Sequence, residues 1–131
     1  MVIDTSALVA IALDEPECDM FTQAILKADR ALLSAASWLE VTIVLDRKLP
    51  ADRQAVLDGL VEDLRITIVP FSSAQAALAR TAYRAYGLYS PARALNFGDC
   101  FAYALAKETG QKLLFKGNDF SKTDIPSALA A

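Results

Sequence analysis

Four acidic side chains stand out because each lies in or directly after an apolar part of the sequence. Asp4 and Asp119 each follow a short apolar run of the length of a strand, and Glu40 and Asp99 lie inside longer apolar segments. A carboxylate in apolar surroundings costs free energy unless it is paired, hydrogen-bonded or bound to a metal ion. These four acids are therefore the first candidates for chemistry.

Four carboxylates brought together would favour a divalent cation. Like charges a few ångströms apart raise one another's pKa, and a cation removes that repulsion. Hard Mg²⁺ or Mn²⁺ prefers oxygen ligands and keeps positions open for water and phosphate oxygens. Such a site can activate water against a phosphodiester. The chain has no histidine, which excludes the usual hydrolase triads and most zinc sites.

Helix capping is the other explanation for two of these acids. Ser37-x-x-Glu40 has the spacing of a capping box, and Asn96-x-x-Asp99 places an acid at the same third position. The two explanations are compatible, because helices that follow parallel strands begin at the carboxyl edge of the sheet, where ligands bind. Asp4 and Asp119 are expected at that same edge.

The elements that must position these acids alternate along the chain. Apolar and β-branched runs predict strands at residues 1–4, 30–34, 66–69 and 112–115, with a short edge strand around 124–126. Helical periodicity and capping residues predict two helices within residues 5–28, broken near Glu15-Pro16, and further helices at 37–48, 50–63, 72–86 and 96–109. This alternation predicts an α/β fold, a three-layer α/β/α sandwich with a mainly parallel central sheet.

Length and composition are those of a single domain, which we place at residues 1–131. The longest stretch without a charge, residues 66–79, is shorter than the roughly 18 apolar residues of a membrane-spanning helix. The start of the chain lacks the basic opening of a secretory signal. We therefore expect a cytoplasmic protein that does not enter a membrane.

The charge and the cysteines exclude further classes. A net charge of −3 lacks the broad basic surface that grips duplex nucleic acid, so any nucleic-acid site must be local. Cys18 and Cys100 lie far apart and outside any Cys-x-x-Cys spacing, which argues against a disulfide scaffold and a structural zinc site.

Four blocks of sequence extend this pattern over almost the whole chain. They are Asp4-Thr5-Ser6-Ala7-Leu8, the isolated Glu40, Leu95-Asn96-Phe97-Gly98-Asp99-Cys100 with Ala104-Leu105-Ala106, and Leu113-Leu114-Phe115-Lys116-Gly117-Asn118-Asp119-Phe120 with Thr123-Asp124-Ile125. In order and spacing they resemble the PIN-domain VapC toxins of bacterial type II toxin–antitoxin pairs. The resemblance implies a PIN-like sandwich, Mg²⁺-dependent endoribonuclease activity, a homodimer, and inhibition by a cognate VapB-type antitoxin whose tail covers the active site.

Carried over position by position, the resemblance assigns a role to each acid. Asp4, Glu40 and Asp99 look like the core metal ligands, and Asp119 looks like the fourth acid. Mg²⁺ is the implied cofactor, with Mn²⁺ able to replace it.

Four polar neighbours of the acids are assigned supporting roles. Ser6, and in second place Thr5, would supply a hydroxyl beside the acids, and Asn96 would cap the loop that carries Asp99. Many relatives carry an acid at the position of Asn118, so the negative charge at a second metal position is reduced here. The resemblance leaves open whether one metal ion binds or two.

Six further side chains are candidates for contact with an RNA substrate. They are Arg80, Arg84, Tyr89, Arg93, Lys116 and Lys122. Arg80 and Arg84 share a helix face, and Arg93 and the lysines lie near loops that should border the acids. The ring of Tyr89 could stack on an unpaired base. The alternative is an ordinary solvated surface.

Three other functions compete with an RNA nuclease. An aspartyl phosphatase or phosphotransferase would use Asp4 as a nucleophile, but the Asp-x-Asp pair of one such group is absent because position 6 is Ser6. A single-stranded DNA nuclease of the same fold is the nearest alternative. A non-catalytic interaction module, in which the acids are caps, predicts no metal binding.

Overall fold

A computed structural model describes residues 1–129, so the last two residues of the predicted domain lie outside the described part. Four parallel strands form one sheet in the order β3-β2-β1-β4. Along the chain the elements are β1 (Val2–Ile3), α1 (Thr5–Ala12), α2 (Cys18–Lys27), β2 (Ala31–Ser34), α3 (Ala35–Lys48), η1 (Ala51–Arg53), α4 (Val56–Asp63), β3 (Ile66–Val69), α5 (Ser73–Tyr86), α6 (Asp99–Thr109), β4 (Leu113–Leu114) and η2 (Asp119–Lys122).

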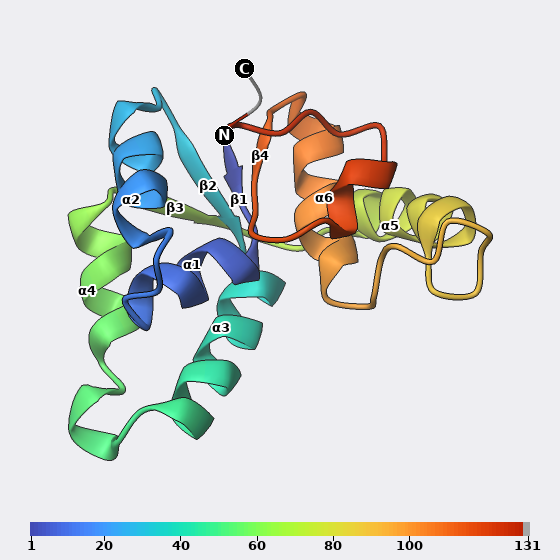
Figure 1. Cartoon of the computed structure of the whole chain (residues 1–131). Coiled ribbons are helices and arrows are strands. Elements are labelled where there is room, and N and C mark those ends of the chain that lie inside the picture. Colours follow the sequence, from blue (N-terminus) through green and yellow to red (C-terminus); the bar gives the residue numbers. More distant parts are fainter. Residues whose placement is uncertain (130–131) are drawn as a thin grey trace.

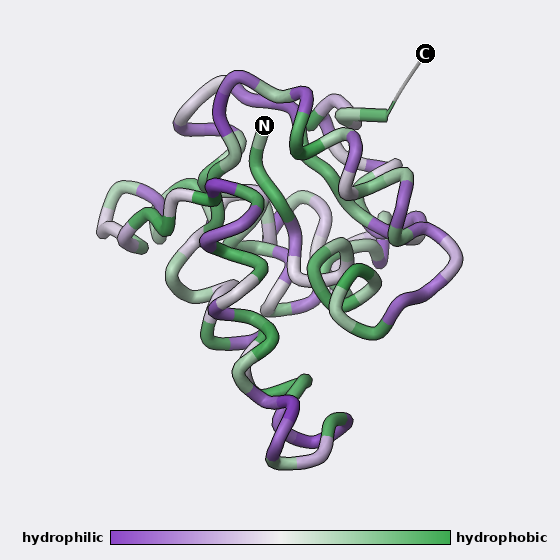
Figure 2. The backbone as a smooth tube through the Cα atoms, turned by 90° about the vertical axis from the view of Figure 1, so that its left-hand side faces the viewer, coloured by the Kyte–Doolittle hydropathy of each residue, from purple (hydrophilic) through white to green (hydrophobic). Residues whose placement is uncertain are grey.

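Successive side chains along each strand point into two different apolar cores, one on each face of the sheet. Ile3, Leu33 and Leu114 belong to one core, and the residue before each of them belongs to the other. This follows from the period of two in a strand, where successive side chains point to opposite faces. Figure 2 shows hydrophobic segments in the middle of the molecule and a largely hydrophilic tip where α3 turns towards α4. Both faces are therefore buried along β1, β2 and β4, as is usual for parallel sheets, whereas Thr67 and Ile68 of the edge strand β3 are exposed.

Helices cover both faces of the sheet. Side chains of α1, α2, α3 and α4 complete the first core, and side chains of α5 and α6 complete the second. Figure 1 shows the two groups of helices on opposite sides of the strands. The prediction of a three-layer α/β/α sandwich is confirmed. Within residues 1–129, no helix combines the length and the apolar character needed to cross a bilayer.

The start of α3 differs from the prediction, and the difference removes one proposed cap. Ser34 ends β2 and also caps α3, because its hydroxyl accepts the Ala36 amide at 3.3 Å. Ser37 therefore lies inside the helix, fully buried, and its hydroxyl has no hydrogen-bond partner within the described chain. The predicted capping box of Ser37 and Glu40 is wrong.

Other boundaries also differ from the prediction. The single helix predicted for residues 50–63 is divided into η1 and α4. The edge strand predicted near residues 124–126 is only one bridge, between Leu113 and Ser127. The last helix was predicted from Asn96 but begins at Asp99, and it ends as predicted at Gly110, whose φ of 68° is a left-handed conformation that glycine adopts readily.

Candidate active site

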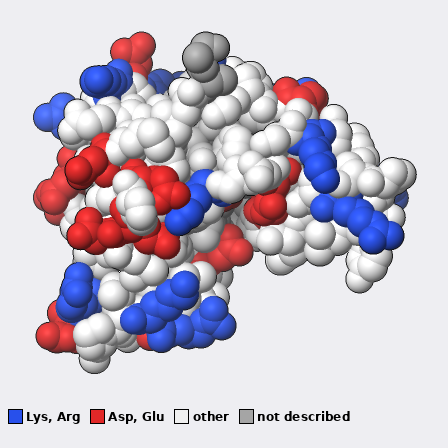
Figure 3. Space-filling model, viewed as in Figure 1, with Lys and Arg blue, Asp and Glu red and all other residues white. Residues whose placement is uncertain are grey.

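The four predicted acids lie at the carboxyl edge of the sheet. Asp4 follows β1, Glu40 lies on the helix that follows β2, Asp119 follows β4, and Asp99 begins α6. Figure 3 shows this side of the molecule hollowed between the lobe of α3 and α4 and the lobe of α5, with acidic atoms across its middle. Parallel strands deliver their ends to one edge, and this explains why distant parts of the sequence meet here.

Asp4 is a buried acid that is only partly satisfied. It is 3% exposed, and one carboxylate oxygen, Oδ2, accepts the Ser6 amide at 3.0 Å and the Ser6 hydroxyl at 2.6 Å. The other oxygen, Oδ1, is buried with no hydrogen-bond partner among residues 1–129. Burial raises the pKa of Asp4 to about 6, against the effect of the Ser6 hydrogen bonds and with help from the charge of Glu40. Asp4 thus caps α1 and still presents a free oxygen.

Glu40 is held by two contacts from distant parts of the chain. The Thr5 hydroxyl donates a hydrogen bond to its Oε1 at 2.6 Å. Its carboxylate also lies against Gly98, so closely that a Cβ atom on Gly98 would overlap it. The absence of a side chain at Gly98 therefore lets Glu40 lie beside the start of α6, next to Asp99.

Asp99 and Asn96 hold one another in a reciprocal pair. The Asp99 amide donates to the Asn96 side chain at 2.9 Å, and the Asn96 amide donates to Asp99 Oδ2 at 3.0 Å. Burial raises the pKa of Asp99 to about 7, and the charges of Asp4, Asp119 and Glu40 add to the rise. The capping geometry predicted from the spacing of Asn96 and Asp99 is confirmed, and the acid lies within the field of the other three.

Asp119 and its neighbour are exposed. Asp119 opens η2, and Asn118 precedes it without a capping hydrogen bond from its side chain. Asp119 follows β4, which pairs in parallel with β1, so it lies at the same edge of the sheet as Asp4. Asp119 is thus the most solvated member of the set.

The four acids have the right chemistry for a hard divalent cation, although their carboxylates are not gathered around a single point. Among residues 1–129, no three acidic side chains are arranged as ligands of one ion. The unpartnered Oδ1 of Asp4 is the stronger observation, because a buried carboxylate oxygen is costly unless hydrogen bonds or a cation satisfy it. Oxygen donors alone match Mg²⁺ and Mn²⁺.

The side chains predicted to bind RNA show no direct contact with the four acids. In the described chain, Arg80, Arg84, Tyr89 and Arg93 are exposed and form no hydrogen bond or ion pair with the four acids. Tyr89 is 95% exposed. Lys122 donates to the Ala92 carbonyl at 3.2 Å. Lys116 forms ion pairs with Glu15 and Glu17, so its charge is already compensated.

Three features of the site were not predicted. Gly98 lies between Asn96 and Asp99, and a glycine directly before an acid is a sequence signal that another group approaches the backbone closely. Phe97 is 77% exposed beside the acids and borders two apolar hollows of about 430 and 410 Å³. The pairing of Lys116 with Glu15 and Glu17 joins residues about 100 apart and has no local signal.

Metal-free protein is expected to lose stability as the pH rises through the range in which the buried acids ionise. The pKa values of Asp4 and Asp99, about 6 and about 7, lie above the ordinary value of about 3.9. A raised pKa means that the folded state binds protons more tightly than the unfolded state. The stabilisation that this proton binding gives the folded protein is complete below about pH 4 and is lost as the pH rises through 6 to 7. In EDTA, between pH 5 and pH 8, the melting temperature of the parent protein should fall by roughly 3 to 6 °C more than that of the Asp99→Asn variant. Parallel curves for parent and variant would show that Asp99 ionises freely.

Comparison with known proteins supplies an independent line of observation. The family model of the PIN domain matches residues 1–126. Ribonuclease VapC30 of Mycobacterium tuberculosis is 45% identical over 125 residues, which cover 95% of each protein. Ribonuclease VapC of Mycolicibacterium smegmatis is 44% identical over 125 residues, covering 95% of this chain and 97% of the relative.

Two solved structures share the fold. Mycobacterium tuberculosis VapC20, described as a sarcin-ricin loop cleaving toxin, superposes with a TM-score of 0.77 at 14% identity and covers 95% of each chain. A toxin–antitoxin complex from Klebsiella pneumoniae gives a TM-score of 0.73 at 16% identity, covering 94% of this chain and 92% of that one. At such identities the likeness concerns the fold alone.

Proposed function

The chain belongs to the PIN-domain family, among the VapC proteins, and from this premise we propose that it is a Mg²⁺-dependent endoribonuclease toxin held inactive by a cognate antitoxin. The observation that carries the proposal is the set of four acids at the carboxyl edge of the sheet, with one buried oxygen of Asp4 left unpartnered in the described chain. The names of the similar proteins, ribonucleases in both cases, support RNA as the substrate.

The residues of the site divide into ligands and the groups that orient them. Asp4, Glu40, Asp99 and Asp119 would hold the cation. When bound, Mg²⁺ supplies positive charge that activates a water molecule and stabilises charge developing on the phosphodiester. Ser6, Thr5 and Asn96 each fix one of the first three acids through a hydrogen bond. Preset orientation of this kind lowers the reorganisation needed for reaction.

Asn118 limits how much negative charge the site contains. It is exposed next to Asp119, and as an amide it adds no charge for a second cation. One strongly held metal ion is therefore enough for the proposed activity.

An antitoxin would act on the same acids. A cluster of carboxylates that lacks its cation attracts an arginine, whose planar fork pairs with carboxylates in two parallel hydrogen bonds. The likeness in fold to a chain of a toxin–antitoxin complex is consistent with such a partner.

The homodimer implied by the family remains part of the proposal, and exposed Leu39, Ile43 and Phe97 offer apolar surface for it.

The expected activity is cleavage of single-stranded RNA that depends on Mg²⁺ or Mn²⁺. The chain has carboxylates and no histidine, so we expect a bound cation to supply the positive charge that activates water and stabilises the reacting phosphodiester. Matched RNA and DNA oligonucleotides of one sequence, incubated with Mg²⁺, Mn²⁺ or excess EDTA, test both substrate and cofactor. Cleavage of DNA alone would favour the DNA nuclease alternative, and undiminished cleavage in EDTA would rule out the metal-dependent mechanism.

A further inference from the structure

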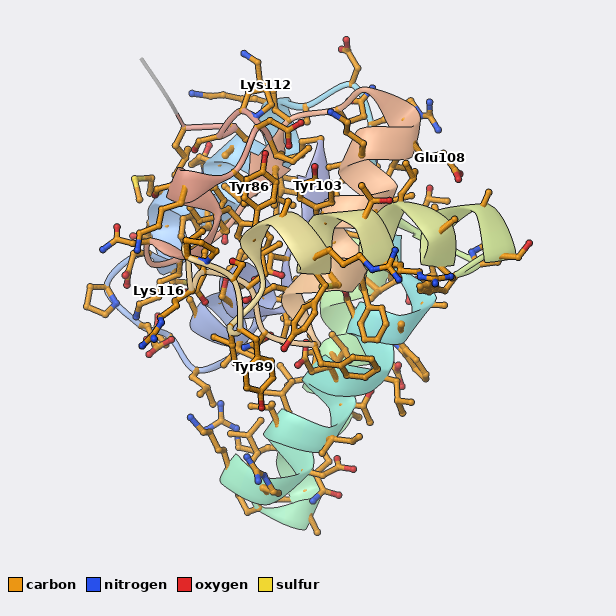
Figure 4. The ribbon with its side chains drawn as sticks, turned by 90° about the vertical axis from the view of Figure 1, so that its right-hand side faces the viewer. Tyr86, Tyr89, Tyr103, Glu108, Lys112 and Lys116 are labelled. Carbon is orange, nitrogen blue, oxygen red and sulfur yellow. The ribbon has the colours of Figure 1, made fainter. Side chains whose placement is uncertain are left out.

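Lys116 is the centre of a set of contacts that joins three separate segments of the chain. Its ammonium group lies 3.2 Å from Glu17 Oε2 and 3.4 Å from Glu15 Oε2, and these three side chains are each about one third exposed. The Glu17 carboxylate, and after it Glu15, raises the pKa of Lys116 above its ordinary value. Figure 4 shows Lys116 beside the segment that joins α1 to α2. The side chain is thus engaged on the protein.

The backbone of the same residue reaches the first acid of the site. The Lys116 amide donates to the Ser6 hydroxyl at 2.9 Å, and that hydroxyl donates to Asp4 Oδ2 at 2.6 Å. Ser6 therefore accepts from one segment and donates to the other. Lys116 is fixed at both ends, by its amide towards Asp4 and by its ammonium towards the α1–α2 segment.

Asp119 lies three residues after Lys116 in the same turn. Between them, Gly117 has a φ of 94°, and the turn ends where Phe120 is buried against Phe115, with ring centroids 5.1 Å apart. Asp119 itself is exposed, and it follows β4 at the same edge of the sheet as Asp4, which follows the neighbouring strand β1. Asp119 thus lies between two residues that are fixed by contacts, Lys116 and the buried Phe120.

We infer that Lys116 is a positioning residue, which together with Ser6, Glu15 and Glu17 holds the turn at residues 116–119 so that Asp119 faces the other three acids. The inference rests on the proposed function, in which Asp119 is the fourth acid. It replaces the sequence-based expectation that Lys116 contacts an RNA phosphate. A lysine that already has two carboxylate partners would have to give them up to bind a phosphate.

Two sets of substitutions test this role because they change the charge in opposite directions. Lys116→Met removes a positive charge, and the pair Glu15→Gln with Glu17→Gln removes two negative charges. Both break the same contacts. Each should raise the Mg²⁺ concentration that gives the half-maximal melting shift, and the concentration for half-maximal RNA cleavage, by about 10-fold. A purely electrostatic effect on the metal would move the two variants in opposite directions.

Two further comparisons separate positioning from general destabilisation. The triple variant should be no worse than either set alone, because the groups act as one unit. In an Asp119→Asn background, Lys116→Met should add nothing. The control is Lys112→Met, which removes the same charge from an exposed lysine far from Lys116 (Figure 4) and should leave the Mg²⁺ requirement unchanged.

The outcomes distinguish this inference from the proposed function. If the parent shows a Mg²⁺ melting shift but cleaves no RNA, the function fails, while the shifts of the variants still decide the role of Lys116. If Lys116→Met raises only the KM for RNA, and the paired glutamate variant keeps the Mg²⁺ requirement of the parent, Lys116 is a phosphate contact and the inference is overturned. Additive effects of the two sets, or a further loss in the Asp119→Asn background, would also overturn it.

Discussion

Replacing Asp4 by asparagine is expected to abolish RNA cleavage, with a loss of more than about 100-fold at saturating Mg²⁺. In Asp4→Asn the amide oxygen can still accept the hydrogen bonds from Ser6. The amide nitrogen would then occupy the position of Oδ1, the buried oxygen that has no partner in the described chain. A nitrogen that donates hydrogens cannot replace an anionic oxygen ligand. The same reasoning applies to Glu40→Gln and Asp99→Asn.

The measurement is the initial rate of cleavage of single-stranded RNA by the parent and the three variants. Asp46→Asn is the control, because Asp46 is an exposed acid on the same helix as Glu40. Its rate should match that of the parent. Melting temperatures in EDTA show whether each variant is folded. Full activity in all three folded site variants would remove the acids from the mechanism.

Gly98→Ala is expected to reduce cleavage by about 100-fold while the protein remains folded. The added methyl group would overlap the Glu40 carboxylate, so Glu40 must move away from Asp99. Displacement of a catalytic group by about 1 Å costs on the order of 100-fold in rate. The backbone at Gly98 has φ −64° and ψ −37°, a helical conformation that alanine adopts without strain. The defect should therefore appear in activity more than in stability.

Gly59→Ala is the matched control for Gly98→Ala. Gly59 lies within α4, and a Cβ atom there would meet nothing within 4 Å. That variant should keep the cleavage rate of the parent and gain about 0.5 to 1 kcal/mol in stability, because alanine is favoured over glycine within a helix. A second variant, Gly98→Ala with Glu40→Asp, gives the carboxylate room and should recover part of the lost activity. Unchanged cleavage by Gly98→Ala would show that the position of Glu40 is unimportant.

The sheet and its helices were predictable because they follow from local signals. β-Branched runs such as Ile66–Val69 and caps such as Ser72, whose hydroxyl accepts the Gln75 amide at 3.1 Å, are visible in the sequence. The start of α3 was not predictable in the same way. Ser34 and Ser37 are both capping residues by type, and the strand β2, which ends at Ser34, decides between them.

The edge of the sheet at which the four acids lie was predictable, but the contacts that hold their side chains were not. Parallel topology brings strand ends to one edge, so the sequence alone is enough to place Asp4 and Asp119 there. The contact of Thr5 with Glu40, 35 residues away, depends on how α1 packs on α3. In the same way, the ion pairs of Lys116 depend on how the segment after β4 lies beside the α1–α2 segment. Long-range packing of this kind has no counterpart in spacing along the chain.

The central claim is that the four acids form a metal site, and thermal melting with and without Mg²⁺ tests it most directly. A cation that binds only the folded protein stabilises it by about 1.4 kcal/mol at roughly ten times its dissociation constant, a shift of roughly 3 to 6 °C for a domain of this size. In EDTA at pH 7.5, Asp99→Asn should melt at or above the parent, because burial, and after it the charges of Asp4, Asp119 and Glu40, disfavour the ionised form of Asp99 and raise its pKa. Its amide oxygen can still accept from the Asn96 amide.

With Mg²⁺ at fixed ionic strength, the melting temperature of the parent should rise by roughly 3 to 6 °C, and that of the Asp99→Asn variant should rise by less. The order of the two melting temperatures should therefore reverse. If the parent gains nothing from Mg²⁺ and the variant melts lower by the same amount in both buffers, Asp99 serves only as a helix cap and the metal site does not exist.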